Sequence, residues 1–439
     1  MAAALRRILL LNLMMMSLMV MGGIIQDDNE IIKTRMEDFS GYKFPLQDDS
    51  SSFTVDSLNL QKQIDELSSF SDSPLPSVTR ILYSDNDVLA RRFIKNLMGL
   101  SGLSIREDDV GNILGRWEGS EPGLQAVSAG SHIDAIPYSG KYDGVVGVLG
   151  AMEAINVLKS RLLAGSVSLA TALKQTADNQ NISFLDAAKA AGYAKNEDFS
   201  DVFLDDRSYS AFVELHIEQG PILENEGISI GIVTAIAAPA SIKIDFGGNG
   251  GHAGATLMPQ RNDAGLAAAE LALAVEKHVL ESGSVDTVGT VGILELHPGA
   301  INSIPSKSHL EIDTRDIDEN RRNKVIEKIH ESAVSISKRR GVELLEFKIV
   351  NQDPPALSDE SVIKAMESAT QVLNLSHKKM ISRAYHDSLF MARKAPMGMI
   401  FIPCYKGYSH KPEEYASPED IANGVKVLAL TLAKLSINS

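Results

Sequence analysis

The first candidate for metal chemistry is a histidine followed by two aspartates. His132 is separated from Asp134 by one residue, and Asp143 comes shortly after in a glycine-containing turn. Asp134 could accept the second ring N–H of His132 and so fix the tautomer that a metal ligand needs. Taken alone, the motif has a simpler interpretation, in which Asp143 caps a helix and His132 lies in a turn.

Two further histidines occur in comparable settings. His216 lies in an alternating segment that continues into Glu218 and Gln219, and His410 follows Ser409. Each histidine by itself is more often a surface or core residue. Three histidines with an aspartate favour a metal centre, because imidazole and carboxylate together suit zinc, manganese, nickel or iron. An aspartate between histidines suggests a two-metal site that polarises a carbonyl and generates hydroxide from water.

Other polar residues lie outside these segments. His252 belongs to a glycine-rich loop, which lacks the helix context of a nucleotide fingerprint and is also typical of a hairpin with an incidental histidine. Arg315 could clamp a carboxylate in a bidentate manner or form an ordinary surface ion pair. Further polar residues among apolar strands are Asn302, Tyr385, His386 and Asp387.

The elements that must position the histidines follow a strand, loop, helix order, which is the unit of an α/β domain with functional groups at the carboxyl ends of strands. Strands are expected at 113–117, 125–129 and 400–402, and helices at 57–68, 85–100, 143–159 and 418–435. In the helix at 85–100, the apolar spacing places Val88, Leu89, Phe93 and Leu97 on one face.

Residues 241 to 350 have a different order of predicted strands and helices. Strand, helix, strand, strand, helix and strand are expected at 241–246, 262–280, 287–296, 307–313, 318–339 and 342–350. This order is the ferredoxin-like βαββαβ unit. The Asp-Pro-Pro sequence at 353–355 marks a boundary. We therefore predict an α/β catalytic domain at 55–240 and 354–439, with a smaller domain at 241–353 inserted into it.

Composition limits the class of protein. The 439 residues are 44% hydrophobic and 23% charged, which is an ordinary globular mixture. The formal charge of −15 argues against a nucleic-acid partner, because such binding relies on clustered basic residues. Cys404 is the single cysteine, so the chain has neither an intrachain disulfide framework nor a cysteine-based zinc site.

The N-terminus has the pattern of a secretory signal. Arg6 and Arg7 precede a largely apolar run at 8–20, and two glycines follow. The run is short for a membrane span, which needs roughly 20 residues. A buried core helix is the alternative interpretation. We expect a signal sequence at 1–23, a flexible lead-in at 24–54, no stable membrane span, and a place in the endoplasmic reticulum or secretory pathway.

Taken together, the motifs resemble a known family. They are His132-x-Asp134, Tyr142-Asp143-Gly144, Glu214-x-His216-x-Glu218-Gln219-Gly220, Gly251-His252 and Ser409-His410. The set is similar to the metal-dependent amidohydrolases related to allantoate amidohydrolase and N-carbamoyl amino-acid hydrolase, in the aminoacylase and carboxypeptidase-like superfamily. The resemblance covers roughly residues 55 to 437. The C-terminal segments 381–388 and 403–410 are similar to the plant branch of this family that acts on ureidoglycolate.

The resemblance implies a metallopeptidase-like catalytic domain with an inserted lid and dimerisation domain. It also implies hydrolysis of (S)-ureidoglycolate to glyoxylate, ammonia and carbon dioxide in purine catabolism. Two manganese ions per subunit are implied as cofactors, with zinc, nickel or cobalt as alternatives, and the assembly implied is a homodimer. Allantoate or an N-carbamoyl amino acid is the alternative substrate.

Roles carry over from the family residue by residue. His132 and His216 would bind one ion and His410 the other, with Asp143 bridging them. Asp134 would orient His132, and His252 would reach across the dimer to stabilise the tetrahedral oxyanion. The substrate would be held by Gln219, His252, Asn302, Arg315, Tyr385 and His386. Within that set, Arg315 would pair with the carboxylate, and Tyr385 would favour ureidoglycolate over allantoate.

The chain departs from the family pattern in one place. Family members have a strand that ends in a Glu-Glu pair, which supplies the general base and a ligand of the second ion. Here Lys159 continues directly to Ser160, and no such pair occurs between Asp143 and His216. We infer an internal deletion, as from a skipped exon or a gene-model error.

The deletion leaves the second ion with only Asp143 and His410. A general base typically contributes ~10²–10⁴-fold to the reaction rate, so its loss would greatly slow turnover unless a carboxylate such as Glu218 replaces it. A catalytically silent isoform that acts as a dimer partner is the alternative function.

Overall fold

The computed structural model describes residues 55–116, 125–157 and 209–437. The predicted signal sequence, the lead-in and the Lys159–Ser160 junction lie outside these ranges. The chain divides into two compact units: unit 1 comprises Met1–Thr234, Ser358–Met380 and Phe390–Ser439, and unit 2 comprises Ala235–Leu357 and Ile381–Leu389. The segment 381–389, which the sequence pattern left in the catalytic domain, thus belongs with unit 2.

A six-stranded sheet has the order β14-β7-β16-β6-β4, with β15 also pairing with β7, and its strands β16, β6 and β4 lie wholly in unit 1. Its strands are β4 (Ala126–Ala129), β6 (Tyr209–Ile217), β7 (Ile230–Ile236), β14 (Ala356–Leu357), β15 (His377–Ser382) and β16 (Met397–Ile402). The neighbours β4, β6 and β16 run parallel to one another. Every residue of β16 is buried, which is typical of a parallel strand covered on both faces. The α/β prediction is confirmed.

Five helices of unit 1 accompany this sheet and its small neighbouring sheets. They are α3 (Ser57–Ser68), α4 (Asp85–Leu100), α5 (Val145–Val157), α11 (Glu360–Val372) and α13 (Pro418–Ile437). Side chains of Asp56, Ser84 and Asp359 accept hydrogen bonds from the first turns of α3, α4 and α11. Such caps satisfy N–H groups that a helix start leaves without partners, which explains why these helices begin where they do.

The buried face of α4 differs from the predicted one. The helix packs through Ala90, Ile94 and Met98, whereas Leu89 is 42% exposed. Asp87 and Arg91 are also buried, and Arg91 Nε lies 2.7 Å from an Asp87 carboxylate oxygen. Phe93 and Leu97 of the expected face pack against the core, but Leu89 does not. Apolar spacing cannot show that an ion pair lets two charged residues face the core.

Smaller elements complete unit 1. They are the pair β1 (Val78–Arg80) and β5 (Ala135–Ser139), the pair β2 (Ser104–Glu107) and β3 (Ile113–Arg116), the short helix α8 (Ile222–Glu226), and the 3₁₀ turn η4 (Tyr405–Gly407). The sequence pattern did not predict β5, where Ile136, Pro137 and Tyr138 are exposed. An exposed edge strand with a proline carries no alternating apolar signal.

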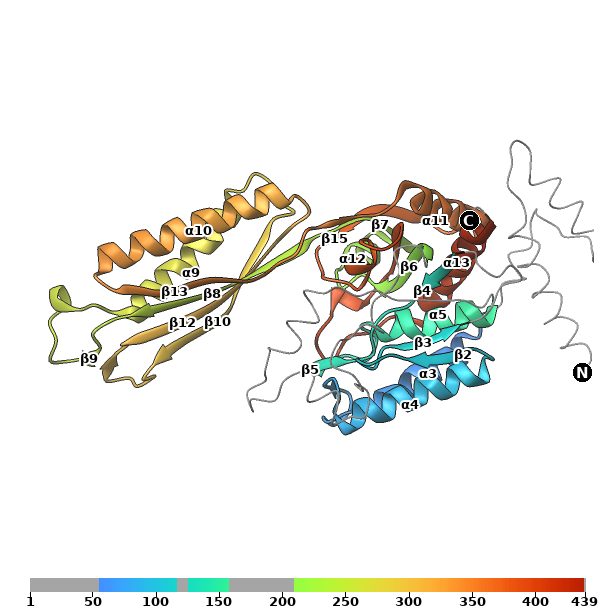
Figure 1. Ribbon diagram of the computed structural model, residues 1–439, viewed down its shortest axis with the longest axis horizontal. Coiled ribbons are helices and arrows are strands. Elements are labelled where there is room, and N and C mark those ends of the chain that lie inside the picture. The colour runs from blue at the N-terminus through green and yellow to red at the C-terminus, as the bar shows by residue number, and fades with distance from the viewer. Residues whose placement is uncertain (1–54, 117–124, 158–208, 438–439) are drawn as a thin grey trace, which may run out of the picture. The chain divides into compact units, whose positions relative to one another are not determined.

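Unit 2 has the predicted ferredoxin-like order. Its strands are β8 (Ala238–Gly247), β10 (Val288–His297), β12 (Lys307–Asp316) and β13 (Glu343–Gln352), paired antiparallel in the order β10-β12-β8-β13. The helices α9 (Ala264–Leu280) and α10 (Glu319–Arg340) lie along one face of this sheet (Figure 1). Their buried side chains form a core with the inward residues of β8 and β12. The βαββαβ prediction is confirmed.

The remaining elements of the described chain are short. They are β9 (Gly251–His252), which pairs with β11 (Ser303–Ile304), the 3₁₀ turn η3 (Met258–Gln260) and the helix α12 (Ser388–Met391). Within the described ranges, none of the helices combines the length and the apolar character that crossing a bilayer requires.

Candidate metal centre

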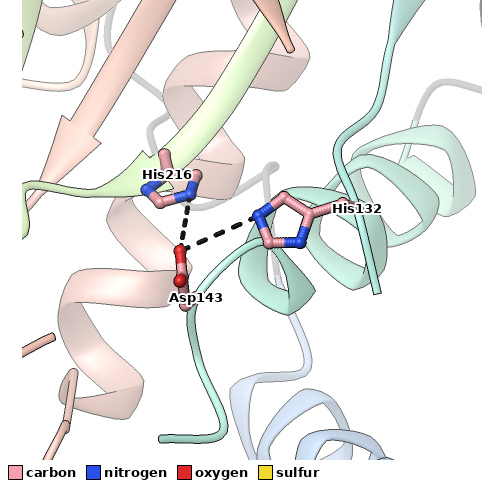
Figure 2. A group of neighbouring side chains, drawn as sticks. All are labelled: His132, Asp143 and His216. Atoms are coloured by element: carbon pink, nitrogen blue, oxygen red, sulfur yellow. Dashed lines mark ion pairs between the residues drawn. The ribbon is translucent and has the colours of Figure 1, made fainter. Parts of the chain in front are cut away.

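Asp143 lies at the centre of three histidines. Its Oδ1 is 3.2 Å from His216 Nε2 and 3.8 Å from His132 Nε2 (Figure 2). Its other oxygen, Oδ2, is 3.1 Å from His410 Nε2. The ligand atoms of His132, Asp143 and His216 all lie within 4.8 Å of one another. One carboxylate therefore faces two imidazoles with one oxygen and a third imidazole with the other, which is the arrangement expected of a bridging ligand.

The sheet explains why these residues meet. His132 comes three residues after β4 ends, His216 is the penultimate residue of β6, and His410 follows η4 beyond the end of β16. Because β4, β6 and β16 are parallel, their carboxyl ends share one edge of the sheet. Asp143 joins them at the start of α5, two residues before the first helical residue.

Gly144 lets the His132 ring approach this helix start. A Cβ built at Gly144 would lie 2.5 Å from His132 Cε1 and Nε2, and the glycine has a φ of +66°. A side chain is thus excluded both by the ring and by the left-handed backbone, which glycine adopts without steric cost.

Hydrogen bonds orient two of the imidazoles. His216 Nδ1 is 2.8 Å from the carbonyl oxygen of Ile217, and His132 Nδ1 is 3.2 Å from an oxygen of the Asp134 carboxylate. An Nδ1–H that donates to such oxygens leaves the lone pair on Nε2, and Nε2 is the atom that faces Asp143 in both rings. The geometry is compatible with the predicted orienting role of Asp134.

The charges of the cluster are coupled. Burial alone would raise the pKa of Asp143, but hydrogen bonds with His216 and His410 outweigh it and hold that pKa far below its usual range. The hydrogen bond with Asp143 raises the pKa of His410. For His216, burial lowers the pKa, and the contact with Asp143 outweighs it and gives a net increase. The carboxylate thus attracts positive charge, and three imidazoles with one carboxylate fit a divalent first-row ion.

Gln219 is also brought to the centre. Its amide Nε2 is 3.1 Å from Asp143 Oδ1 and 2.8 Å from Ser409 Oγ. Both Gln219 and His410 have positive φ angles, 56° and 57°. Non-glycine residues in this region cluster at functional sites, because the surrounding structure must hold them there.

Two predicted site residues of unit 2 lie together at the tip of a glycine-rich loop. His252 in β9 pairs with Ser303 in β11, and the N–H of Ala253 donates to the carbonyl of Asn302 at 2.9 Å. Both His252 and Asn302 are exposed. Their roles in oxyanion and substrate binding stay predictions.

The other predicted substrate residues of unit 2 have partners within that unit. Arg315 pairs with Asp313 through Nε at 2.7 Å and through Nη2 at 3.1 Å. The Tyr385 hydroxyl donates to an Asp353 carboxylate oxygen at 2.7 Å, and the buried His386 lies 2.8 Å from Ser382 Oγ. The guanidinium fork of Arg315 is thus engaged by a carboxylate of its own strand, as in the ion-pair interpretation of this residue.

Glu218 and Glu414 are two of the buried glutamates near this centre. Both oxygens of Glu218 accept backbone N–H groups of α8, from Ile222 at 2.9 Å and from Leu223 at 2.8 Å. Glu218 therefore caps a helix, and the hypothesis that it replaces the missing base receives no support. Glu414 lies against the Asp143 loop, and burial together with the Asp143 charge raises its pKa. Sequence reasoning gave Glu414 no role, because the adjacent Glu413 and Glu414 look alike in the pattern.

The chain is similar to known hydrolases over most of its length. A sequence model described as Peptidase family M20/M25/M40 matches residues 129–434. A ureidoglycolate hydrolase of Arabidopsis thaliana is 68% identical over 97% of this chain and 98% of its own length. One of Oryza sativa subsp. japonica is 70% identical over 92% of this chain and 91% of its own. An N-carbamoyl-L-amino-acid amidohydrolase of a Pseudomonas species is 34% identical over 87% and 99%.

Solved structures agree with these relatives. The crystal structure of AtUAH in complex with glyoxylate has a TM-score of 0.84 and 72% identity, covering 88% of this chain and 99% of that chain. A hydantoinase/carbamoylase family amidase from Burkholderia vietnamiensis has a TM-score of 0.80 and 28% identity, covering 89% and 99%. With its α/β sheet, its histidines around Asp143 and these similarities, the chain belongs to peptidase family M20/M25/M40.

Proposed function

We propose that this chain has the framework of an amidohydrolase that converts (S)-ureidoglycolate to glyoxylate, ammonia and carbon dioxide in purine catabolism. The observation that carries the proposal is the convergence of three histidines on Asp143 in a chain 68% identical to a ureidoglycolate hydrolase. A relative with 72% identity, AtUAH, was solved with glyoxylate, which is the product expected of this reaction. Relatives that act on N-carbamoyl amino acids or allantoate are 31–34% identical.

The metal would be held by the residues around Asp143. His132, His216 and Asp143 would hold one ion, and Asp143 with His410 would hold a second, weaker one. A bound divalent ion supplies a Lewis acid and a water of lowered pKa. We expect manganese, with zinc, nickel or cobalt as alternatives, because all accept imidazole and carboxylate ligands.

Hydrogen bonds within the chain preorganise this centre for a ligand. The ionised Asp143 supplies the negative charge, and Asp134 and the Ile217 carbonyl keep His132 and His216 turned with Nε2 toward it. Gln219 uses its amide N–H groups on Asp143 and Ser409, so its carbonyl oxygen is suited to accept an N–H of a ureido group.

We propose that turnover by the chain as written is very low, because the Glu-Glu pair is missing. One observation supports the deletion: the alignment with the Arabidopsis relative extends over 465 positions, whereas this chain has 439 residues. The relative therefore has residues without a counterpart here. The loss of a positioned general base removes about 10²–10⁴-fold of rate.

We also propose a homodimer formed through unit 2. The edge strand β10 exposes Ile293, Leu294 and Leu296, which are 39–47% accessible. Along α9, which packs against β10, the exposed leucines are Leu266, Leu273 and Leu280, spaced seven residues apart on one face. An open strand edge beside an apolar helix stripe is suited to pair with a second copy. In such a dimer, His252 would serve the partner's site.

We also propose that this protein enters the endoplasmic reticulum. The support is the basic pair Arg6 and Arg7 before the apolar run at 8–20. Cleavage and retention can be followed with a fluorescent fusion to residues 1–54, compared with a fusion in which both arginines are replaced by glutamate.

Ligand recognition tests the proposed substrate without requiring turnover. Calorimetric titration of the manganese-loaded chain with glyoxylate should show binding, and Asp143→Asn should abolish it if the product sits at the metal. In competition, ureidoglycolate should displace glyoxylate at lower concentration than allantoate does. Tighter binding of allantoate would contradict the assignment.

A silent dimer partner is the second candidate function, and the absence of the Glu-Glu pair is what favours it. Co-expression with the intact relative would separate the two. A silent partner should form mixed dimers and change the activity of the intact subunit, whereas a merely impaired enzyme should leave the rate per intact subunit unchanged.

A further inference from the structure

Glu414 is a buried carboxylate to which neither the sequence pattern nor the proposed mechanism gave a role. The residue is 3% exposed and lies four positions after His410. Its Oε1 accepts the backbone N–H of Tyr142 at 2.8 Å and that of Asp143 at 2.9 Å. Its Oε2 accepts the backbone N–H of His410 at 3.3 Å. One side chain thus holds the main chain on both sides of the contact between Asp143 and His410.

Gly140 makes room for the Glu414 side chain. A Cβ built at Gly140 would lie 2.3 Å from Glu414 Cβ and 2.5 Å from its Oε1. Burying a carboxylate is unfavourable unless hydrogen-bond donors surround it, and here the donors are backbone groups of the two loops together with the Ser409 side chain. The glycine and the donors together define a site built for the Glu414 carboxylate.

His410 has an unusual backbone conformation beside Glu414. Its φ of 57° is a left-handed conformation that a non-glycine residue seldom adopts. Strained residues of this kind persist where neighbouring contacts over-determine them. The hydrogen bond from His410 N–H to Glu414 is one such contact, and the ring of the same residue meets Asp143 Oδ2 at 3.1 Å.

We propose that Glu414 is a positioning residue of the metal centre, which clamps the Asp143 and His410 loops together so that both ligands face a shared ion. The inference rests on the metal centre of the proposed function and is independent of the identity of the substrate. Glu414 acts through the main chain of the ligands. Loss of partners behind metal ligands typically costs about 10–100-fold in metal affinity.

The test compares two adjacent glutamates. Glu414→Gln keeps the size of the side chain but offers one acceptor oxygen where three N–H donors converge, and its amide N–H₂ would oppose a donor. Glu413→Gln is the matched control, because Glu413 is exposed. We expect Glu414→Gln to weaken Mn²⁺ binding by the full chain by about 10–100-fold, measured by calorimetry and by paramagnetic resonance of free Mn²⁺. Glu413→Gln should leave the dissociation constant unchanged.

Two further measurements separate positioning from general stability. Hydrogen exchange should quicken in peptides spanning 140–146 and 408–412 of Glu414→Gln and stay unchanged elsewhere. Gly140→Ala, which displaces Glu414 without removing its charge, should weaken Mn²⁺ binding in the same way and decides the question if Glu414→Gln does not fold.

Several results would overturn the clamp. They are an unchanged Mn²⁺ dissociation constant in either folded variant, a lower melting temperature with unchanged affinity, unfolding of both variants, or no Mn²⁺ binding by the unsubstituted chain. Failure of the proposed substrate would look different, because Mn²⁺ affinity would still depend on Glu414 while the manganese-loaded chain bound neither glyoxylate nor ureidoglycolate.

Discussion

At the scale of single residues, the chemistry is concentrated in one carboxylate and its imidazole neighbours. Asp143 has a lowered pKa, whereas His216 and His410 have raised pKa values. Burial alone would shift each of these pKa values in the opposite direction, so the contacts between the three groups determine the shifts. A divalent ion competes with protons for the same Nε2 lone pairs. The pH at which the metal-free centre gains or loses protons therefore reports on the contacts between Asp143 and the histidines.

The first prediction is a pH dependence of the chelator-treated chain. The raised histidine pKa values contribute stability that is fully present below the ordinary value of 6.5 and is lost as pH rises through the folded values. The lowered pKa of Asp143 contributes stability above its ordinary value of 3.8, which is lost only as pH falls through the lower folded value. Urea unfolding should therefore show a free energy of unfolding that falls as pH rises above 6.5.

Asp143→Asn is the control for this pH dependence. Because the neutral amide cannot stabilise imidazolium, the loss of stability above pH 6.5 should largely disappear in this variant. An identical slope in both chains would contradict the assigned coupling. Mn²⁺ affinity of the unsubstituted chain should change in the opposite direction and rise with pH, since neutral imidazole is the ligand.

The sequence pattern predicted the histidines and the aspartate that converge at this centre, because histidine and aspartate types with strand-end spacing are visible in one dimension. Glu414 was missed, because its partners are backbone N–H groups distant in sequence. Arg80 was missed for the same reason: it is 1% exposed and donates to the carbonyls of Leu67, Phe70 and Ile133, the last between His132 and Asp134. A buried side chain whose partners are backbone groups cannot be recognised from a sequence motif.

At the scale of elements, three parallel strands and one helix start fix the site. Helix starts with capping side chains were predictable to within two residues, as at Asp263 before α9 and Asp318 before α10. The α4 face and strand β5 were not predictable, because one depends on a buried ion pair and the other is exposed and contains proline. The segment 381–389 was misplaced because its contacts with unit 2, such as Tyr385 with Asp353, join residues far apart in the chain.

The second prediction concerns the start of α5. Gly144→Ala should weaken Mn²⁺ binding by at least tenfold and lower stability by about 1–3 kcal/mol, because its Cβ would meet the His132 ring and its φ is +66°. Gly227→Ala is the matched control, with a φ of +64° and no atom within 4 Å of the added Cβ. This variant should lose a similar amount of stability from its left-handed backbone and should retain its Mn²⁺ affinity. Equal affinity losses in both variants would show that the ring contact is unimportant. Chemical denaturation and calorimetry measure the two effects.

At the scale of the whole molecule, the chain combines a unit that carries the candidate metal centre with a ferredoxin-like unit in which the edge strand β10 and a leucine stripe on α9 are exposed. The sequence predicted this inserted unit well, because its alternating strands and amphipathic helices have clear periods. Exposure of Leu266, Leu273 and Leu280 could not be read from the pattern, since an alanine-rich helix offers several apolar faces.

The third prediction concerns assembly. Leu273→Glu should convert the proposed dimer to a monomer in sedimentation equilibrium, because a charge would enter an apolar interface at a residue that is 68% exposed in the single chain. Leu58→Glu is the control, since Leu58 in α3 of unit 1 is 79% exposed. A sedimentation profile of Leu273→Glu that matches the unsubstituted chain would place the interface elsewhere.

The fourth prediction tests the in-trans role of His252. In a chain repaired with the family's Glu-Glu segment, His252→Ala and His216→Ala should each be inactive alone. Mixing the two should restore part of the activity, because one site of each mixed dimer would have an intact His216 and receive His252 from the other subunit. If mixing restores nothing while mixed dimers form, His252 does not act across the interface.

The most direct test of the account is ammonia release from ureidoglycolate by two chains, with and without manganese. One is the chain as written, and the other carries the family's strand with its Glu-Glu end between Lys159 and Ser160. The account predicts very low release by the first chain and manganese-dependent release by the second, faster by about 10²–10⁴-fold, with ureidoglycolate preferred over allantoate. Robust manganese-dependent turnover by the unrepaired chain would contradict the claim that the deletion removes the catalytic base.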